Sequence, residues 1–428
     1  MKVFLKVSNS EVCGKISIPG SKSHTIRALF FSALAKGKSK IQNPLMSSDS
    51  ISAVNLCTAF GADYSFIDDC YTVNGVGSNP RVPENIIDVG NSGTSLRLGV
   101  MTAALVEGYT VFTGDYQIRQ RQIGPLVDAI KNLGGEAFTT RGNSSAPVVI
   151  KGRAAGGFTK LDSITSQYLS SILVNAPLLE KDTHIEVTRL NEIPYVEITL
   201  WWLDKLGIKY KHNGMKEFFI PGQQRYLPFE ATIPGDFSSA TFFMVHCAIS
   251  GQEMELTNLD MSDPQGDKRV LTLLEDMGAK VSYGKNSVII KGQKLQGRHI
   301  DMNSIPDALP AMAVAACFAE GETRLLNVPQ ARMKETDRIS VMCKELTKMG
   351  ANIKELPDGL IIKESKLKGC KVNGHDDHRI VMSLAIAGLN CSGDTIIDTA
   401  EAMNVTFPSF VECIQSCGGK IELLELEL

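Results

Sequence analysis

The chain has 428 residues, of which 43% are hydrophobic and 21% charged, and its formal net charge is −3. This length exceeds what one hydrophobic core usually organises, so it predicts two or three domains. The small net charge provides no field that would attract nucleic acid or an anionic membrane, and any affinity for anions must come from local clusters.

The cysteines and the N-terminus both favour the cytoplasm. The ten cysteines include no Cys-x-x-Cys pair and no spacing typical of metal ligands, and several lie in apolar runs. The first six residues contain no apolar signal region, and no apolar run reaches the length of a membrane span. We therefore expect a cytoplasmic protein.

The first informative stretch runs from Pro19 to Arg27. A Pro-Gly pair precedes Lys22, Ser23 and Arg27, and an apolar run follows. The start of a helix exposes unpaired backbone N–H groups at its positive end, so cations there indicate an anion site. An ordinary serine cap is the simpler alternative for a single example. The recurrence of the pattern along the chain favours the anion site.

A unit of amphipathic helix, glycine and strand occurs six times. Glycine suits a helix C-terminus that needs a positive φ, and a fixed period is typical of repeated supersecondary units. The six glycines lie about 70 residues apart: Gly61, Gly134, Gly207, Gly278, Gly350 and Gly418.

Each unit also contains a second helix that is apolar on nearly every side and is therefore predicted to be buried. These helices span about 26–34, 96–106, 168–178, 240–249, 308–318 and 380–389. Strands are predicted at 110–113, 148–151, 184–188, 218–220, 253–257, 287–291, 324–327, 360–363 and 395–398.

The predicted fold class is α/β, with six repeated units in two pseudo-symmetric domains of three, buried helices inside and sheets outside. Proline and glycine breaks divide the chain into one domain at 20–234 and another that combines 1–19 with 235–428. The two crossovers, near 19–20 and 233–236, are the predicted hinge.

A polar cluster precedes every buried helix. If the helices of a domain run parallel, their positive N-termini emerge on one face, and two such faces would hold a polyanion. For 165–167 alone, a plain N-cap is the better explanation, whereas the Gly-Asn-Ser-Gly-Thr stretch before Arg97 slightly favours phosphate contact. His378 and Arg379 could instead form a buried ion pair with Asp376 or Asp377.

Two loops add charge to these clusters. The loop 114–121 carries Arg119 and Arg121, and the stretch 332–338 alternates in sign, although a surface helix start with a Glu335–Arg338 pair explains it equally well. No metal-ligand, nucleotide-binding or acyl-enzyme motif is present. Cations and hydroxyls around Asp307 and Glu335 suit proton transfer on highly anionic substrates.

Four motifs in this order resemble the 5-enolpyruvylshikimate-3-phosphate synthase family: Pro-Gly-Ser-Lys-Ser…Arg27, Gly-Asn-Ser-Gly-Thr-Ser-Leu-Arg97, Lys-Glu-Thr-Asp-Arg338 and Asp-His-Arg379. The resemblance spans the chain and implies the six-unit, two-domain fold. It also implies transfer of the carboxyvinyl group of phosphoenolpyruvate to the 5-hydroxyl of shikimate 3-phosphate by addition and elimination. This step belongs to the shikimate pathway to chorismate and the aromatic amino acids, and it needs no cofactor or metal.

The resemblance also implies a role for individual residues. Catalytic roles fall to Lys22, Asp307 and Glu335. Shikimate 3-phosphate would contact Lys22, Ser23, Arg27, Thr165, Ser166, Gln167, Tyr195, Asp307, Gln330 and Lys334. Phosphoenolpyruvate would contact Lys22, Asn91, Gly93, Arg121, Gln167, Arg338, His378 and Arg379. No nucleic acid or membrane partner is expected, and the absence of a large apolar stripe favours a monomer.

Four positions differ from the family pattern: Gln330 replaces an asparagine, Gln122 replaces a proline after Arg121, and two others carry more weight. Val405 stands where a lysine is expected to contact phosphoenolpyruvate, and Glu192 stands where a serine is expected near the shikimate phosphate. An inward-facing Glu192 would repel that phosphate unless Arg189 compensates. The alternatives are a paralogue acting on a related anionic cyclohexenol and a non-catalytic anion-binding homologue. A cell-wall amino-sugar transferase is disfavoured, because the loop 114–121 lacks its cysteine and Ser23, not asparagine, follows Lys22.

Overall fold

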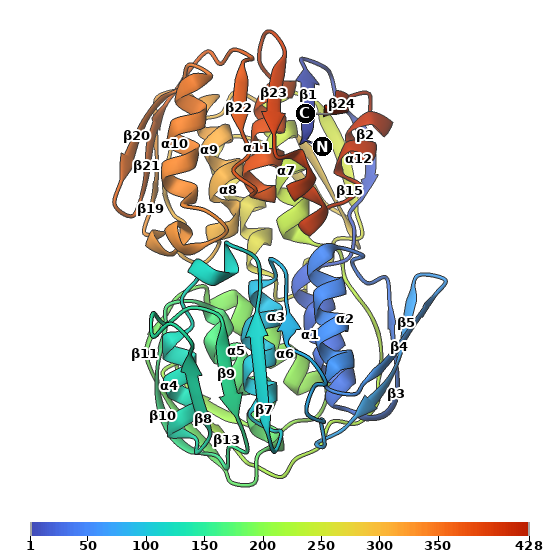
Figure 1. Cartoon of the computed structure of the whole chain (residues 1–428). Coiled ribbons are helices and arrows are strands. Elements are labelled where there is room, and N and C mark those ends of the chain that lie inside the picture. The colour runs from blue at the N-terminus through green and yellow to red at the C-terminus, as the bar shows by residue number, and fades with distance from the viewer. Residues whose placement is uncertain (1, 427–428) are drawn as a thin grey trace. The chain divides into compact units, whose positions relative to one another are not determined.

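The computed structural model describes residues 2–426. The chain divides into two compact units, which we call the first unit (Lys22–Ile233) and the second unit (the stretch up to Ser21 and the stretch from Pro234 onward). Each unit has its own hydrophobic core. Figure 1 shows the helices and strands of both units.

The first unit contains three buried and three amphipathic helices in alternation. The helices are α1 (Lys22–Leu34), α2 (Ser48–Ala59), α3 (Gly93–Ala103), α4 (Gly124–Asn132), α5 (Ser166–Asn175) and α6 (Ile193–Lys205). Its sheets comprise β3 (Lys36–Gln42), β4 (Asp63–Ile67), β5 (Cys70–Val76) with β14 (Glu230–Thr232); β6 (Ile87–Asp88), β7 (Tyr109–Thr113), β8 (Glu136–Thr139), β9 (Val148–Lys151); and β10 (Gly157–Ser163), β11 (Thr183–Leu190), β12 (Lys211–Asn213), β13 (Glu217–Ile220).

The second unit repeats this alternation. The helices are α7 (Phe237–Ser250), α8 (Arg269–Met277), α9 (Leu309–Cys317), α10 (Arg338–Lys348), α11 (His378–Leu389) and α12 (Phe410–Ser416). Its sheets comprise β2 (Gly14–Ser17), β15 (Glu253–Thr257), β16 (Lys280–Tyr283), β17 (Ser287–Lys291); β18 (His299–Asp301), β19 (Glu322–Leu326), β20 (Asn352–Leu356), β21 (Gly359–Lys363); and β1 (Lys2–Ser8), β22 (Lys371–Asn373), β23 (Thr395–Asp398), β24 (Lys420–Leu426).

The six sheets formed by residues 2–426 share one topology. Each has four strands, of which one edge strand pairs in parallel and the other pairings are antiparallel. The six repeat glycines all have positive φ, between 70° and 120°, directly after an amphipathic helix or as its cap residue. The predicted six-unit α/β fold is therefore confirmed.

The odd-numbered helices form the interior of each unit. In the second unit α7, α9 and α11 contact one another, and in the first unit α3 contacts both α1 and α5. Nearly every residue of these helices is buried, which agrees with their all-round apolar sequences. Because the buried helices of a unit pack against one another, the polar residues of their first turns lie next to the hydrophobic core of that unit.

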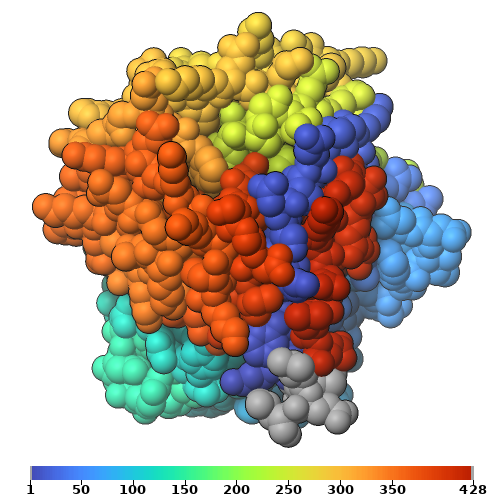
Figure 2. Space-filling model, turned by 90° about the horizontal axis from the view of Figure 1, so that it is seen from above, coloured from blue at the N-terminus to red at the C-terminus, as the bar shows by residue number. Residues whose placement is uncertain are grey.

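The first strand of the chain and its last two strands belong to one sheet. Strand β1 lies between β23 and β24 and pairs antiparallel with both (Figure 2). The two crossovers also pair with each other, since Ser21 donates a backbone hydrogen bond of 2.8 Å to Pro234 and Asp236 donates one of 2.9 Å to Pro19.

Candidate active site

The first two turns of α1 carry two cations, a partly buried lysine and a buried arginine. Lys22 is the first residue of the helix, and its Nζ lies 3.2 Å from a carboxylate oxygen of Asp49. Arg27 donates to the Thr199 hydroxyl and the Tyr195 carbonyl, both at 2.8 Å. Burial lowers the pKa of Arg27 to about 10, which still leaves it charged at neutral pH.

Two guanidinium groups converge at the start of α3. A Cβ on Gly93 would lie 2.6 Å from Nη1 of Arg97 and 2.8 Å from Nη1 of Arg121, so any larger residue would displace these guanidinium groups. Burial lowers the pKa of Arg97, and the charge of Arg121 acts in the same direction. Arg121 also donates to Asn91 Oδ1 at 3.2 Å. Two cations beside a helix N-terminus form a suitable site for a carboxylate or phosphate.

Arg97 also orients Gln167, a residue predicted to contact both substrates. It donates to Gln167 Oε1 at 2.7 Å, and Gln167 Nε2 donates to Thr94 Oγ1 at 3.0 Å. The amide therefore has a fixed orientation on the first turn of α5. Neither Arg97 nor Thr94 was among the predicted contact residues, although both lie in the Gly-Asn-Ser-Gly-Thr-Ser-Leu-Arg motif.

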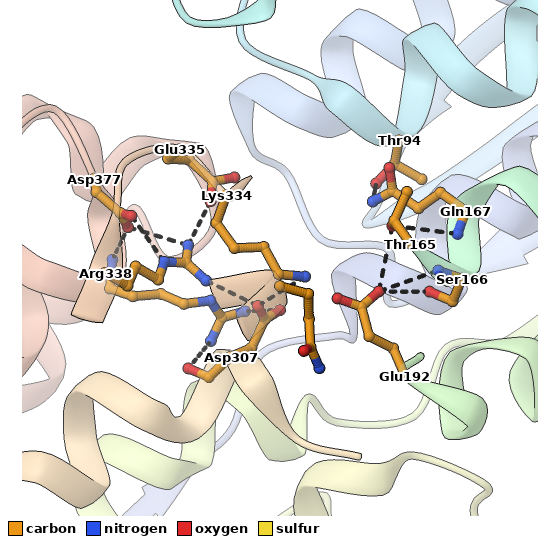
Figure 3. Close-up of polar contacts among 12 residues, drawn as sticks. Thr94, Thr165, Ser166, Gln167, Glu192, Asp307, Lys334, Glu335, Arg338 and Asp377 are labelled. Atoms are coloured by element: carbon orange, nitrogen blue, oxygen red, sulfur yellow. Dashed lines mark hydrogen bonds and ion pairs between the residues drawn. The ribbon is translucent and has the colours of Figure 1, made fainter. Parts of the chain in front are cut away.

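A carboxylate occupies the N-terminus of α5. Glu192 Oε2 accepts hydrogen bonds from Ser166 Oγ (2.9 Å), Ser166 N (3.2 Å) and Thr165 Oγ1 (3.3 Å), as Figure 3 shows. Glu192 is 2% exposed. Arg189 does not compensate this charge, because it forms hydrogen bonds of 2.7 and 2.6 Å with Asp162 on the surface.

In the second unit, Arg338 holds three carboxylates together. It donates to Asp377 at 2.8 and 3.2 Å, to Asp307 at 2.8 Å and to Glu335 at 2.5 Å (Figure 3). Burial opposes its charge, but the surrounding carboxylates raise the pKa of Arg338 above its ordinary value. The predicted Glu335–Arg338 pair exists, yet Arg338 is 1% exposed, so a surface helix start is the wrong description.

Asp307 lies among three cations. It belongs to the short helix η4 (Pro306–Ala308), and its carboxylate oxygens are 2.8 Å from Arg338, 3.1 Å from Arg379 and 3.6 Å from Lys334. Burial opposes ionisation, but the charges of Arg379, Lys334 and Arg338 hold the pKa of Asp307 well below its usual value. The carboxylate is therefore ionised at neutral pH, the protonation state that a general base needs, while the same cations lower its basicity.

The alternative pairing for Arg379 is corrected by these contacts. Its guanidinium pairs with Asp307, whereas Asp377 accepts from the Arg379 backbone N–H at 2.9 Å as the N-cap of α11. His378 is 1% exposed, and its Nδ1 lies 3.9 Å from Asp377.

The predicted site residue Gln330 donates a side-chain hydrogen bond of 3.0 Å to the backbone carbonyl of Asn303.

The predicted site residues fall in both units. The first unit contains Lys22, Ser23, Arg27, Asn91, Gly93, Arg121, Thr165, Ser166, Gln167 and Tyr195, and the second contains Asp307, Gln330, Lys334, Glu335, Arg338, His378 and Arg379. Across residues 2–426, no group of His, Cys, Asp and Glu could hold a metal ion. Within the same span, every helix is too short or too polar to cross a membrane.

Solved structures define the class of protein that has this fold. The chain is similar to EPSP synthase from Acinetobacter baumannii, with a TM-score of 0.83 and 28% sequence identity, over 99% of this chain and 100% of that chain. A second structure of EPSP synthase from this organism gives a TM-score of 0.82. The fold is thus that of a carboxyvinyl transferase.

Sequence comparisons identify the family. A 3-phosphoshikimate 1-carboxyvinyltransferase from Ruminiclostridium cellulolyticum is 76% identical over 99% of this chain and 100% of its own length. One from Acetivibrio thermocellus is 66% identical with the same coverage. The family model for EPSP synthase (3-phosphoshikimate 1-carboxyvinyltransferase) matches residues 7–414. The chain belongs to the EPSP synthase family, which confirms the predicted transferase class.

Proposed function

We propose that this chain transfers the carboxyvinyl group of phosphoenolpyruvate to the 5-hydroxyl of shikimate 3-phosphate and releases phosphate. The observation that carries the proposal is the cluster of Lys334, Arg338 and Arg379 around the ionised Asp307. A base set among cations suits two substrates that together bring two phosphates and two carboxylates. Membership in the family supports the same reaction.

The first unit supplies most of the proposed contacts to shikimate 3-phosphate. Lys22, Ser23 and Arg27 come from the first turns of α1, and Ser166 and Gln167 come from the first turn of α5. These turns provide backbone N–H groups, hydroxyls and charge together, which is the donor set that phosphate prefers. The proposed set is completed by Thr165, Tyr195, Asp307, Gln330 and Lys334.

The proposed contacts to phosphoenolpyruvate are Arg121, Arg338, His378 and Arg379. The backbone at Gly93 supplies further donors, with Asn91 beside it. Two guanidinium groups near one glycine provide bidentate recognition of a carboxylate or phosphate. The same groups would stabilise negative charge that moves to the phosphate as it leaves.

The proposed chemistry is an addition followed by an elimination. Asp307, with Lys22, takes the proton of the 5-hydroxyl as its oxygen bonds to the central carbon of phosphoenolpyruvate, while Glu335 delivers a proton to the methylene carbon. Glu335 then takes a proton back from the resulting methyl group as phosphate departs, which restores the double bond, and the hydroxyl proton is released from Asp307 with the phosphate. One C–O bond forms, one C–O bond to phosphate breaks, and no oxidant or cofactor is required.

Phosphate release in the presence of both substrates is the direct test. We expect release only when shikimate 3-phosphate and phosphoenolpyruvate are present together, with product mass equal to their sum less phosphate. Omitting either substrate is the matched control. No release with both present would contradict the proposal and leave the paralogue and the binding protein as the alternatives.

Replacing Asp307 by asparagine should lower phosphate release about 10²-fold, because the neutral amide cannot accept the hydroxyl proton.

The contribution of Asp307 to the free energy of unfolding should also depend on pH. Because the folded pKa lies below the unfolded value, the carboxylate stabilises the fold fully above about pH 4 and progressively less as pH falls through the folded pKa. Urea titrations of both proteins at several pH values should therefore converge in acid.

The matched control for this change is Asp128→Asn, whose carboxylate pairs with Lys131 and is 71% exposed. It should alter neither activity nor acid stability measurably. If Asp307→Asn kept full activity, the assignment of Asp307 as the base would be wrong.

Replacing Val405 by lysine should tighten inhibition by anionic analogues of phosphoenolpyruvate. Val405 ends the short helix η6 (Ala400–Val405), which packs against α11, the helix that begins with His378 and Arg379. A cation there would add attraction for the analogue, worth roughly 1 kcal/mol or about fivefold in the inhibition constant. Equal inhibition constants for Val405→Lys and the parent chain would contradict the predicted contribution of a cation at this position.

We also propose that the protein acts as a monomer in the cytoplasm, with the paired crossovers as its hinge. All ten cysteines are thiols, as a reducing compartment would maintain them. Light scattering during size-exclusion chromatography should give a mass near 46.5 kDa. A mass near twice that value would contradict the monomer.

A further inference from the structure

The carboxylate of Glu192 has the hydrogen bonds of a bound anion. One of its oxygens accepts from a helix N-terminal amide and from two hydroxyls, those of Thr165 and Ser166. A phosphate oxygen at a helix N-terminus accepts from the same kinds of donor. Glu192 thus places an internal negative charge in a site built to hold an external one.

The donors that Glu192 occupies are also the proposed phosphate ligands. Thr165 caps α5, and Ser166 is its first residue. A hydroxyl has a single proton to donate, so Ser166 Oγ cannot serve Glu192 and a substrate phosphate at once. Like charges at one set of donors also repel. The carboxylate and the phosphate therefore exclude each other from this position.

The backbone of Glu192 is held in place, and its side chain is what can move. Glu192 has φ 59° and ψ 42° at the N-cap of α6, and its carbonyl accepts from Tyr195 N at 3.0 Å. The Arg27 guanidinium also binds the Tyr195 carbonyl. Vacating the donors therefore requires rotation of the Glu192 side chain, since its backbone is fixed at the start of α6.

We propose that Glu192 is an internal competitor of the substrate phosphate: it occupies the α5 N-terminus in the substrate-free protein and must leave when shikimate 3-phosphate binds. This inference rests on the proposed function. The competition lowers the apparent affinity by the fraction of time that the donors are vacant. Occupancy near 90% would weaken binding of shikimate 3-phosphate about tenfold.

The test compares Glu192→Gln and Glu192→Ser with the parent chain. Gln keeps the shape and still accepts from Ser166, so it controls for folding, and serine leaves the donors vacant. The matched control is Glu197→Gln, an exposed glutamate on the same helix. Calorimetric titration with shikimate 3-phosphate alone gives affinity, and steady-state phosphate release gives a separate KM for each substrate.

We expect Glu192→Ser to bind shikimate 3-phosphate about tenfold more tightly and Glu192→Gln, which still accepts from Ser166 but carries no charge, to fall between it and the parent chain. The KM for phosphoenolpyruvate should change less than twofold, and Glu197→Gln should have no effect. Unchanged or weaker binding by both folded variants would overturn the competitor role while the reaction itself stood. If the parent chain neither bound shikimate 3-phosphate nor released phosphate, the proposed function would fail, and this inference with it.

Discussion

Replacing Lys22 by methionine is expected to reduce phosphate release by about 10³-fold or more. Lys22 is the first residue of α1 and has two proposed tasks, which are to attract the substrate anion and to assist the transfer of the hydroxyl proton. Methionine keeps an unbranched side chain one atom shorter than that of lysine and removes its charge. Steady-state phosphate release at saturating concentrations of both substrates measures the loss.

Stability must be separated from chemistry in this variant. Asp49 is the ion partner of Lys22, and its side chain is 6% exposed, so removing the lysine leaves a buried carboxylate without this cation. The double variant Lys22→Met/Asp49→Asn should recover stability but not activity. Lys15→Met is the control, because Lys15 is 63% exposed and pairs with Glu255. Unchanged phosphate release by Lys22→Met would contradict the proposed reaction, in which Lys22 takes part.

Arg338→Met should lower the free energy of unfolding by about 3–5 kcal/mol, the largest stability effect expected here. The change removes the cation that holds Asp307, Glu335 and Asp377 together and leaves three carboxylates near one another. Lysine at this position keeps the charge but loses the planar fork, so Arg338→Lys should fall between the two. Urea denaturation followed by circular dichroism measures the change.

An exposed pair with similar geometry provides the comparison. Arg189 forms two hydrogen bonds with Asp162, and their side chains are 56% and 44% exposed. Arg189→Met should therefore cost about 0–1 kcal/mol. Equal losses for Arg189→Met and Arg338→Met would show that burial does not amplify the charge cluster.

Most of the fold could be predicted because each unit repeats the same local signals. The predicted strands at 148–151, 253–257, 287–291 and 395–398 match β9, β15, β17 and β23 residue for residue. Edge strands such as β6, with two residues, and β18, with three, were not predicted. A segment of two or three residues is too short to show the alternation of apolar and polar residues that marks a strand, and whether it forms a strand depends on the neighbour with which it pairs.

The candidate site was predicted less completely than the fold. The motifs identified cations and hydroxyls, because helix starts are local in sequence. Apart from the Glu335–Arg338 pair, they did not identify the partners of those groups, such as Asp49 for Lys22 or Asp377 for Arg338. Arg189 was the expected compensation for Glu192 but pairs with Asp162 across β10 and β11. Partner choice is set by tertiary packing, which a spacing pattern does not encode.

The position of β1 between β23 and β24 has a consequence for synthesis on the ribosome. All of the first unit has been made when nearly half of the chain is still missing, so that unit can fold early, whereas β1 waits for its partners. Domains generally fold as units, and that delay lasts on the order of ten seconds or more. Lys2 and Lys6 lie within this waiting strand, and such charges discourage pairing with other nascent chains.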